Sequence, residues 1–278
     1  MSENNIQLSY PQQALDLEGV ANARELGGYV MLDGRKIRRG MLLRSGNLYN
    51  ATEEDVAKLT NEYHVTRVFD FRGDSEFQMF PDRRIPYCIS THIPCINPDD
   101  DEWENTALVQ VAKNFTIEQL VKVAKTDEAK QLTANMYPSL INSEYTRRQY
   151  GLFLKQVTNY DGGATLWHCS QGKDRAGWGA AFVLGALGAS RELIIADFDL
   201  SNIFYQDILN EITEKLIADG GTDADVDVIR AFVGCSKKNF IYTFDLIEKQ
   251  YGSLLHFIIH QLGLSESEIE KMRTIYLE

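Results

Sequence analysis

ATLWHCSQGKDRAGWGAAFVLGAL, residues 164–187, is an apolar segment, a short polar loop and a second apolar segment in direct succession. Ala164–Trp167 indicates a buried strand that ends at His168, because it is apolar and follows a glycine-rich turn. Ala176–Leu187 is rich in Ala, Gly and Leu and indicates a buried helix that begins near Arg175. A strand that leads through a tight loop into a helix predicts an α/β architecture with a largely parallel central sheet flanked by helices.

The loop between these two elements is suited to binding an anion. The first turn of a helix presents unpaired backbone N–H groups and the positive end of the helix dipole, and Gly172 permits the curvature that brings further N–H groups to the same point. Cys169 lies at the mouth of this cradle, where its thiolate is stabilised. Arg175 offers a planar guanidinium that can bind two oxygens of a phosphate. Together these features indicate nucleophilic attack on a phosphoryl group.

The rest of the chain reads as one domain, residues 1–278, because no repeat, low-complexity tract or linker divides it. Val65–Phe71 is rich in β-forming residues and predicts a second strand. A long helix is expected from Arg191 to about Gly220, and the last forty residues read as helical with a break at Gly263. Residues 96–145 differ in character and look inserted.

That insertion predicts helices over Thr116–Lys125 and Asp127–Tyr137, after an acidic loop at residues 99–102. We consider two interpretations of it. It is either a helical lid over the site or an ordinary pair of surface helices.

Composition and charge exclude several classes of protein. The 278 residues carry 28 Lys and Arg against 40 Asp and Glu, a net charge of −12 that disfavours nucleic acid and anionic membranes as partners. The N-terminal residues lack a Sec-type signal pattern and no apolar stretch is long enough for a stable membrane insertion, so a cytoplasmic location is expected, with export by another route left open. Four cysteines without C-x-x-C spacing favour neither a disulfide framework nor a metal site, and we expect no cofactor.

His168-Cys169-x5-Arg175 resembles the signature loop of the cysteine-dependent protein tyrosine phosphatase superfamily. The fuller form, HCxxGKDR, is similar to the bacterial atypical branch, which includes secreted mycobacterial and listerial tyrosine and lipid phosphatases. The resemblance implies a protein-tyrosine-phosphatase-like fold with a helical insertion, and it spans almost the whole chain. Its other elements are residues 22–28, residues 43–48 with Thr52, residues 69–72 with Glu76, residues 187–202, and residues 251–253 with 262–265.

The resemblance implies a role for each residue of the loop. Cys169 is the expected nucleophile, Arg175 clamps the phosphate, and His168 tunes the thiolate. The expected phosphate-binding residues are Ser170, Gln171, Gly172, Lys173 and Arg175.

Two aspartates are candidates for the general acid that protonates the leaving oxygen. The resemblance points to Asp174, within the loop itself. Asp70 is the alternative, because it ends the Val65–Phe71 strand and so lies near the same sheet edge; its structural reading is a pairing with Arg72 or Arg44. The acidic residues 99–102 are a third option.

Two further residues bear on the substrate and on the second chemical step. Lys173 adds a positive charge, which favours either contact with an additional phosphate, as in phosphoinositides, or plain electrostatic support for the thiolate. Ala176 stands where many superfamily loops have Ser or Thr, whose hydroxyl helps the thiolate leave when the intermediate is hydrolysed. The second step is therefore expected to be slower or to use another donor.

The sequence thus predicts a metal-independent phosphomonoester hydrolase that forms a phosphocysteine intermediate. Its expected substrates are phosphotyrosine in proteins, with phosphoserine, phosphothreonine and phosphoinositides as further candidates. An inositol-polyphosphate phosphatase would use the same loop with a more basic pocket, and a sulfurtransferase would not need Asp174 together with Arg175. A catalytically silent phosphate-binding module is the alternative from another class.

Overall fold

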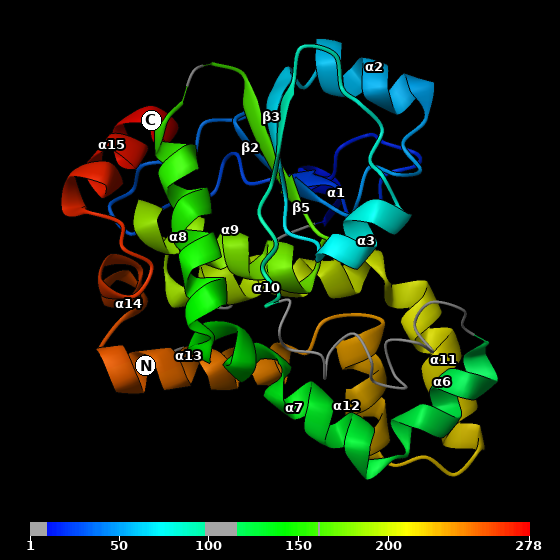
Figure 1. Cartoon of the computed structure of the whole chain (residues 1–278). Coiled ribbons are helices and arrows are strands. Elements are labelled where there is room, and N and C mark those ends of the chain that lie inside the picture. Colours follow the sequence, from blue (N-terminus) through cyan, green and yellow to red (C-terminus); the bar gives the residue numbers. More distant parts are fainter. Residues whose placement is uncertain (1–9, 98–115, 161) are drawn as a thin grey trace.

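The fold is built around a five-stranded sheet, in which neighbouring strands lie in the order β1-β2-β5-β3-β4 (Figure 1). This computed structural model describes residues 10–97, 116–160 and 162–278. β5 lies in the centre and is parallel to β2 and β3, β4 is parallel to β3, and β1 pairs antiparallel with β2. The predicted α/β fold with a largely parallel sheet is confirmed. The strands are β1 Arg24–Glu25, β2 Leu42–Ser45, β3 Val65–Asp70, β4 Ile89–His92 and β5 Ala164–His168.

The alternation of side chains along β5 divides the core between two faces of the sheet. Trp167 points to the face that packs against α8 (Glu144–Thr158) and α9 (Asp174–Leu187). Leu166 points to the other face, where it joins the apolar cluster that includes Leu59 of α2. The helix predicted at Ala176–Leu187 is α9, and it is buried along almost its whole length, as its composition indicates.

The parallel register brings the C-terminal ends of three strands to one edge of the sheet. His168, the last residue of β5, is paired with Ser45 at the end of β2 and with Asp70 at the end of β3. The loop that follows β5 therefore begins between the ends of two neighbouring strands. This edge is where parallel α/β sheets bind their ligands.

A second helical layer lies beside the sheet domain, at the lower right of Figure 1. The helices α6, α7, α11 and α12 share an apolar cluster of their own, while the C-terminal half of α7 joins the main core. The helices predicted within residues 96–145 are confirmed as α6 and α7, and the acidic loop at 99–102 lies outside the described residues. Their bounds are α6 Ile117–Ala124, α7 Asp127–Asn142, α11 Gln206–Ala218 and α12 Asp223–Phe232.

The long helix predicted from Arg191 to about Gly220 is wrong, because the structure has two helices there. α10 ends at Phe204 and α11 begins at Gln206, with the backbone of Tyr205 outside helical geometry. The hydroxyl of Tyr205 donates a hydrogen bond to the carbonyl oxygen of Gln171, 2.9 Å away. This contact is tertiary, so a helical periodicity in the sequence cannot reveal the break.

The C-terminal region is helical, as predicted, and the break at Gly263 precedes the last helix, which Ser265 caps. A second break falls at Gly252, whose φ of +83° is in the left-handed region that favours glycine. Within the described residues, no helix is both long and apolar enough to cross a membrane. The remaining helices are α1 Tyr10–Gln13, α2 Glu53–Asn61, α3 Asp74–Met79, α10 Arg191–Phe204, α13 Lys237–Tyr251, α14 Leu254–His260 and α15 Glu266–Tyr276.

Candidate active site

The loop between β5 and α9 turns its carbonyl oxygens outward. Four consecutive carbonyls, from Ser170 to Lys173, accept hydrogen bonds from side chains or backbone elsewhere in the fold. The donors are Asn47 to Ser170, Asn22 and Tyr205 to Gln171, Arg44 to Gly172, and Arg44 again to Lys173.

The backbone N–H groups of the same residues are left to face the inside of the loop. Within the parts of the chain that the structure describes, none of the N–H groups of residues 170–173 donates to a protein acceptor. The first turn of α9 adds its own unpaired N–H groups at the same point. The loop thus has the unpaired N–H groups that the predicted anion cradle requires.

Gly172 is required by the path of this loop. Its φ of +70° lies in the left-handed region, and a Cβ atom on it would come within 2.3 Å of the backbone carbon of Ser45. The loop thus packs directly on the end of β2 at a point where any side chain would collide with the backbone.

Two buried side chains of opposite charge, Arg44 and Asp197, support the outer side of the loop. Arg44 of β2 donates from Nη2 to the carbonyls of Gly172 and Lys173, at 2.8 and 3.1 Å, and its Nη1 lies 2.6 Å from Oδ2 of Asp197 in α10. Burial alone would raise the pKa of Asp197, but Arg24 and Arg44 outweigh it and hold that pKa below its usual value. A charged, hydrogen-bonded pair behind the cradle fixes the orientation of its carbonyl groups.

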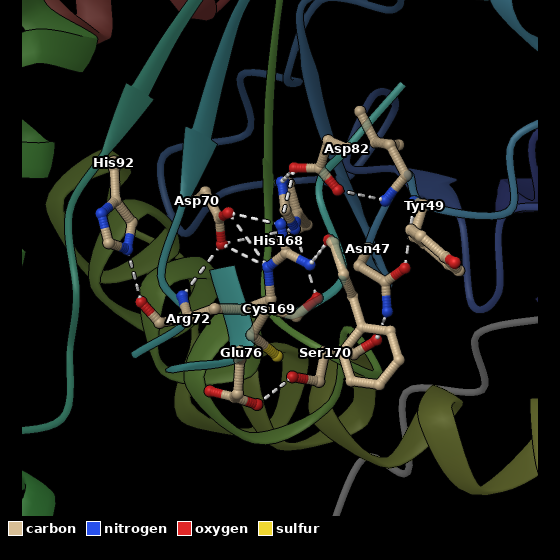
Figure 2. A network of polar contacts seen from close by, with 12 residues as sticks. Asn47, Tyr49, Asp70, Arg72, Glu76, Asp82, His92, His168, Cys169 and Ser170 are labelled. Atoms are coloured by element: carbon tan, nitrogen blue, oxygen red, sulfur yellow. Dashed lines mark hydrogen bonds and ion pairs between the residues drawn. The ribbon is translucent and has the colours of Figure 1, made fainter. Parts of the chain in front are cut away.

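Cys169 and Arg175 meet on the inner side of the loop. The sulfur of Cys169 points to the side where Glu76 and Ser170 meet, away from the Asp70 cluster (Figure 2). Arg175 forms a bidentate ion pair with Glu76 of α3, with Nη1–Oε2 and Nη2–Oε1 distances of 2.5 and 3.0 Å. The hydroxyl of Ser170 also donates to Glu76.

Glu76 is a site residue whose role sequence reasoning missed. It entered only as the last residue of one stretch that resembles the family. Burial opposes its charge, yet Arg175 and Ser170 outweigh that effect and lower the pKa of Glu76 to about 2. Its carboxylate is therefore ionised at neutral pH and orients the guanidinium of Arg175.

Asp174 is the first residue of α9 and lies at the rim of the cradle. Its Oδ1 accepts a hydrogen bond from the hydroxyl of Tyr137 in α7, at 2.5 Å. Its Oδ2 lies 3.6 Å from Nζ of Lys173. Oδ1 is thus held by a tyrosine of the second helical layer, whereas Oδ2 is not bound by that layer and has the ammonium of Lys173 as its nearest charged neighbour.

Asp70 lies behind the loop and is occupied by an ion pair with Arg72. The guanidinium of Arg72 donates from Nε and Nη2 to the carboxylate of Asp70, at 2.7 to 3.0 Å (Figure 2). This is one of the two structural pairings considered from the sequence. The side chain is 5% exposed, so it has little access to the cradle.

His168 faces the same cluster rather than the thiol of Cys169. Its Nε2 lies 3.0 Å from Oδ2 of Asp82, in an ion pair without the alignment of a hydrogen bond, and its Nδ1 lies 3.8 Å from Asp70. Burial opposes its protonation, but Asp70 and Asp82 outweigh burial and raise the pKa of His168. Nδ1 also contacts the carbonyl oxygen of Cys169, at 3.2 Å, so any influence on the thiolate passes through the backbone.

Asp70, Asp82 and His168 bring three metal-ligating atoms within 4.8 Å of one another. A cation already occupies this cluster, because Nη2 of Arg72 lies 2.7 Å from Asp70 and 2.9 Å from Asp82. A metal ion would have to displace that buried guanidinium. The cluster is therefore an ion-pair network that supports the end of β5.

Lys173 departs from its expected role. Its side chain is buried and points away from the cradle, and its ammonium donates to the carbonyl oxygens of Ala231, Phe232 and Gly234, at 3.2 Å and 2.5 Å for the first and last. The three N–H donors of the ammonium thus cap the end of α12 and the turn after it. Its backbone still belongs to the loop, but its charge is held by these carbonyl oxygens.

The site combines a cysteine, an anion cradle and a paired arginine at the end of the central strand, which is the arrangement of a phosphatase. Residues 15–278 match the tyrosine phosphatase family, and the chain belongs to that family.

Two curated relatives place the chain further. It is 25% identical over 277 residues to the "Triple specificity protein phosphatase PtpB" of Mycobacterium tuberculosis, covering 94% of this chain and 98% of that protein. It is 27% identical over 193 residues to the "Putative tyrosine-protein phosphatase H16_A0669" of Cupriavidus necator, covering 68% of this chain and 63% of that protein. The chain is thus a phosphatase enzyme, as its signature loop predicts.

Proposed function

We propose that this phosphatase hydrolyses phosphotyrosine through a covalent phosphocysteine at Cys169. One observation carries the proposal. Four consecutive carbonyls of the loop are bonded outward, so the N–H groups around Cys169 face inward together with the side chain of Arg175. Donors arranged in advance around a phosphoryl group stabilise the charge that its oxygens carry in the transition state.

The proposed reaction has two displacements at phosphorus. In the first, the thiolate of Cys169 forms the S–P bond, the P–O bond to the substrate breaks, and Asp174 gives its proton to the leaving oxygen. In the second, water attacks phosphorus, Asp174 takes a proton from it, the S–P bond breaks and the thiolate returns. Ala176 offers no hydroxyl for this second departure, so the cradle and Arg175 stabilise the leaving thiolate.

Asp174 fits the acid role better than Asp70. Asp174 lies at the rim of the cradle with its side chain 19% exposed, so a substrate oxygen can approach it. Asp70 is held on two sides by the guanidinium of Arg72, and a carboxylate in a bidentate ion pair is a poor proton donor. We assign Asp174 as acid and Asp70 as a support of His168 and the strand end.

The proposed substrates are ranked as the sequence predicts them. Phosphotyrosine comes first, and phosphoserine and phosphothreonine are added on the strength of the triple-specificity name of the mycobacterial relative. Phosphoinositides rest on the resemblance alone, since Lys173 is bonded elsewhere. We also propose that residues 1–278 form one phosphatase domain, with the described helices α6 and α7 of residues 96–145 as its lid; residues 98–115 lie outside the described residues.

A leaving-group experiment tests the proposal. Asp174→Asn should lower kcat/KM, which reports the first displacement, by roughly 10²–10⁴-fold on a phosphotyrosine peptide and much less on 4-nitrophenyl phosphate, whose phenol leaves without protonation. Asp70→Asn should affect both esters equally, or mainly reduce stability. Leaving-group sensitivity found only in the Asp70 variant would move the acid role to Asp70.

The intermediate and the substrate class are tested separately. Acid quenching of a reaction with ³²P-labelled phosphopeptide should leave label on the wild-type chain and none on Cys169→Ser. A panel of phosphopeptides, phosphoinositides and inositol polyphosphates, run with chelator present, should show the fastest turnover on phosphotyrosine. Preference for inositol polyphosphates would favour the second kind of phosphatase, and retention of phosphopeptide without turnover would favour a silent binding module.

A further inference from the structure

The hydroxyl of Tyr137 reaches Asp174 from a different part of the fold. Tyr137 lies in α7, within the region that resembles the family least, and its side chain is fully buried. The ring packs edge-on against Trp178 of α9, with centroids 6.3 Å apart, and against Phe198 of α10, at 5.7 Å. Three helices thus determine where the hydroxyl lies, and it lies 2.5 Å from Oδ1 of Asp174.

The hydrogen bond has a defined direction. Burial, and next the negative charge of Asp174, raise the pKa of Tyr137 well above its usual value, so the phenol keeps its proton and donates it. Oδ1 of Asp174 is therefore an acceptor, both when the carboxyl group is ionised and when it is neutral. A proton carried by Asp174 must then sit on Oδ2.

The surroundings of Asp174 leave Tyr137 as the group that orients it. Oδ2 lies 3.6 Å from the ammonium of Lys173, which is engaged by three carbonyl oxygens. Arg175, next in sequence, is paired with Glu76. Burial raises the pKa of the nearby Cys235 thiol, so that group is neutral.

We propose that Tyr137 is a positioning residue for the general acid, holding Asp174 so that its proton is carried on Oδ2 and directed to the leaving oxygen. The inference rests on the proposed function, because it assigns the partner of the acid that the function requires. It also gives the α6–α7 region a chemical role: the helix that carries Tyr137 contributes to proton transfer without touching the phosphate. Once the proton has left, the same bond stabilises the carboxylate that must act as base in the second step.

Tyr137→Phe tests this role, because it keeps the ring packing and removes one hydroxyl. We expect kcat/KM on a phosphotyrosine peptide, which reports the first displacement, to fall about 10- to 150-fold, as for one lost hydrogen bond to a charged group. On 4-nitrophenyl phosphate kcat/KM should change less than about twofold, because that phenol needs little protonation. Equal losses on both esters, or no loss on either, would overturn the positioning role.

Tyr276→Phe is the matched control. Tyr276 is equally buried, and its hydroxyl donates to the carbonyl oxygen of Val157, at 2.8 Å, in contact with neither Asp174 nor the cradle. It should reduce stability by a similar amount and leave the ratio of the two kcat/KM values at the wild-type level. A changed ratio in this variant would mean that any buried tyrosine affects proton transfer, and the role of Tyr137 would be overturned.

A double variant separates Tyr137 from a general effect on the loop. With Asp174→Asn already in place, Tyr137→Phe should change kcat/KM on phosphotyrosine less than about twofold, because the two residues act as a unit. Multiplied losses would overturn the inference. A wild-type chain that hydrolyses neither ester would instead overturn the proposed function itself, so the two failures are distinguishable.

Discussion

Arg175 and Glu76 are joined by two hydrogen bonds across the inner side of the cradle, at 2.5 and 3.0 Å. Of the five N–H donors of a guanidinium, this ion pair uses two and leaves others for a phosphate. Because Glu76 also accepts from Ser170 and from the backbone N–H of Gly73, it connects the loop to the start of α3. The carboxylate therefore fixes which edge of Arg175 a substrate meets.

Replacing Glu76 by Gln should affect both catalysis and acid stability. The pKa of Glu76 is lowered from 4.5 to about 2, so its contribution to folding is present above pH 4.5 and is lost as pH falls toward 2. That contribution is about 3 kcal/mol at most. Urea unfolding between pH 2 and 6 should show a steeper loss of stability in the wild type than in Glu76→Gln, and kcat/KM at neutral pH should fall by roughly 10- to 100-fold as Arg175 loses its orientation.

Glu248→Gln provides the comparison for that measurement. Glu248 pairs with Arg191 at the surface, with its side chain 38% exposed, and a surface pair contributes less than about 1 kcal/mol. The two glutamine variants should therefore differ clearly. An unchanged pH dependence in Glu76→Gln would show that its ion pair with Arg175 contributes nothing to folding.

Gly172→Ala should disable the cradle. The added Cβ would lie 2.3 Å from the backbone of Ser45, so the loop must move, and a shift of about 1 Å in a catalytic loop costs about 100-fold in rate. Gly220→Ala is the control, since Gly220 has a similar φ of +74° with open space around its Cβ position. That variant should lose about 1 kcal/mol of stability and keep its activity. Comparable activity in the two alanine variants would contradict the collision.

Cys169 should be the thiol that iodoacetate labels first, because the unpaired N–H groups of the loop and the guanidinium of Arg175 attract the carboxylate of the reagent. Burial raises the pKa of Cys88 to about 11, so that half-buried thiol should react far more slowly. Peptide mapping after timed labelling measures both rates. Inorganic phosphate or vanadate should slow the labelling of Cys169 by occupying the cradle, and faster labelling of Cys88 would contradict an anion-binding site at Cys169.

The cluster around His168 should make stability depend on pH near neutrality. Asp70 and Asp82 outweigh burial and raise the pKa of His168 above 6.5, so protonated His168 contributes fully below pH 6.5, and the contribution is lost as pH rises through the raised value. The free energy of unfolding should therefore decline on the alkaline side of pH 6.5, and less so in Asp82→Asn. An NMR titration of the wild-type histidines checks this without a variant, because the His168 signal should titrate above pH 6.5.

Local order in the loop region was predictable from neighbouring residues. Ala164–Trp167 is apolar enough to form a buried strand, Ala176–Leu187 small and apolar enough to form a buried helix, and Gly172 supplies the turn between them. The strand, the helix and the turn depend on interactions within a few residues, so they can be predicted from the sequence. Cys169 and Arg175 lie on the same loop because they are only six residues apart in the sequence.

The direction of a long side chain is a different matter. Lys173 has the charge of a phosphate ligand, yet its ammonium donates to carbonyl oxygens at the end of α12 and in the turn after it. Asp70 lies at the end of a strand beside the loop, yet its carboxylate is bound by the guanidinium of Arg72. Tyr205, where the expected long helix is interrupted, donates a hydrogen bond to the loop. The partners of Lys173 and Tyr205 are supplied by tertiary packing, which a pattern of residue types does not contain, whereas Arg72 lies two residues from Asp70 and its pairing was one of the two considered from the sequence.

The α/β class, the largely parallel sheet and the loop between β5 and α9 were predictable from the residues alone, and Cys169 could be named as the expected nucleophile, because backbone propensity and residue spacing act locally. The surroundings of the loop depend on the folded chain: Glu76 on Arg175, Arg44 and Asp197 behind the loop, and Tyr137 on Asp174. These partners come from as far as 153 residues away in the chain. They meet because parallel strands end at one edge of the sheet and buried charges must find partners there, which is a condition on the folded whole.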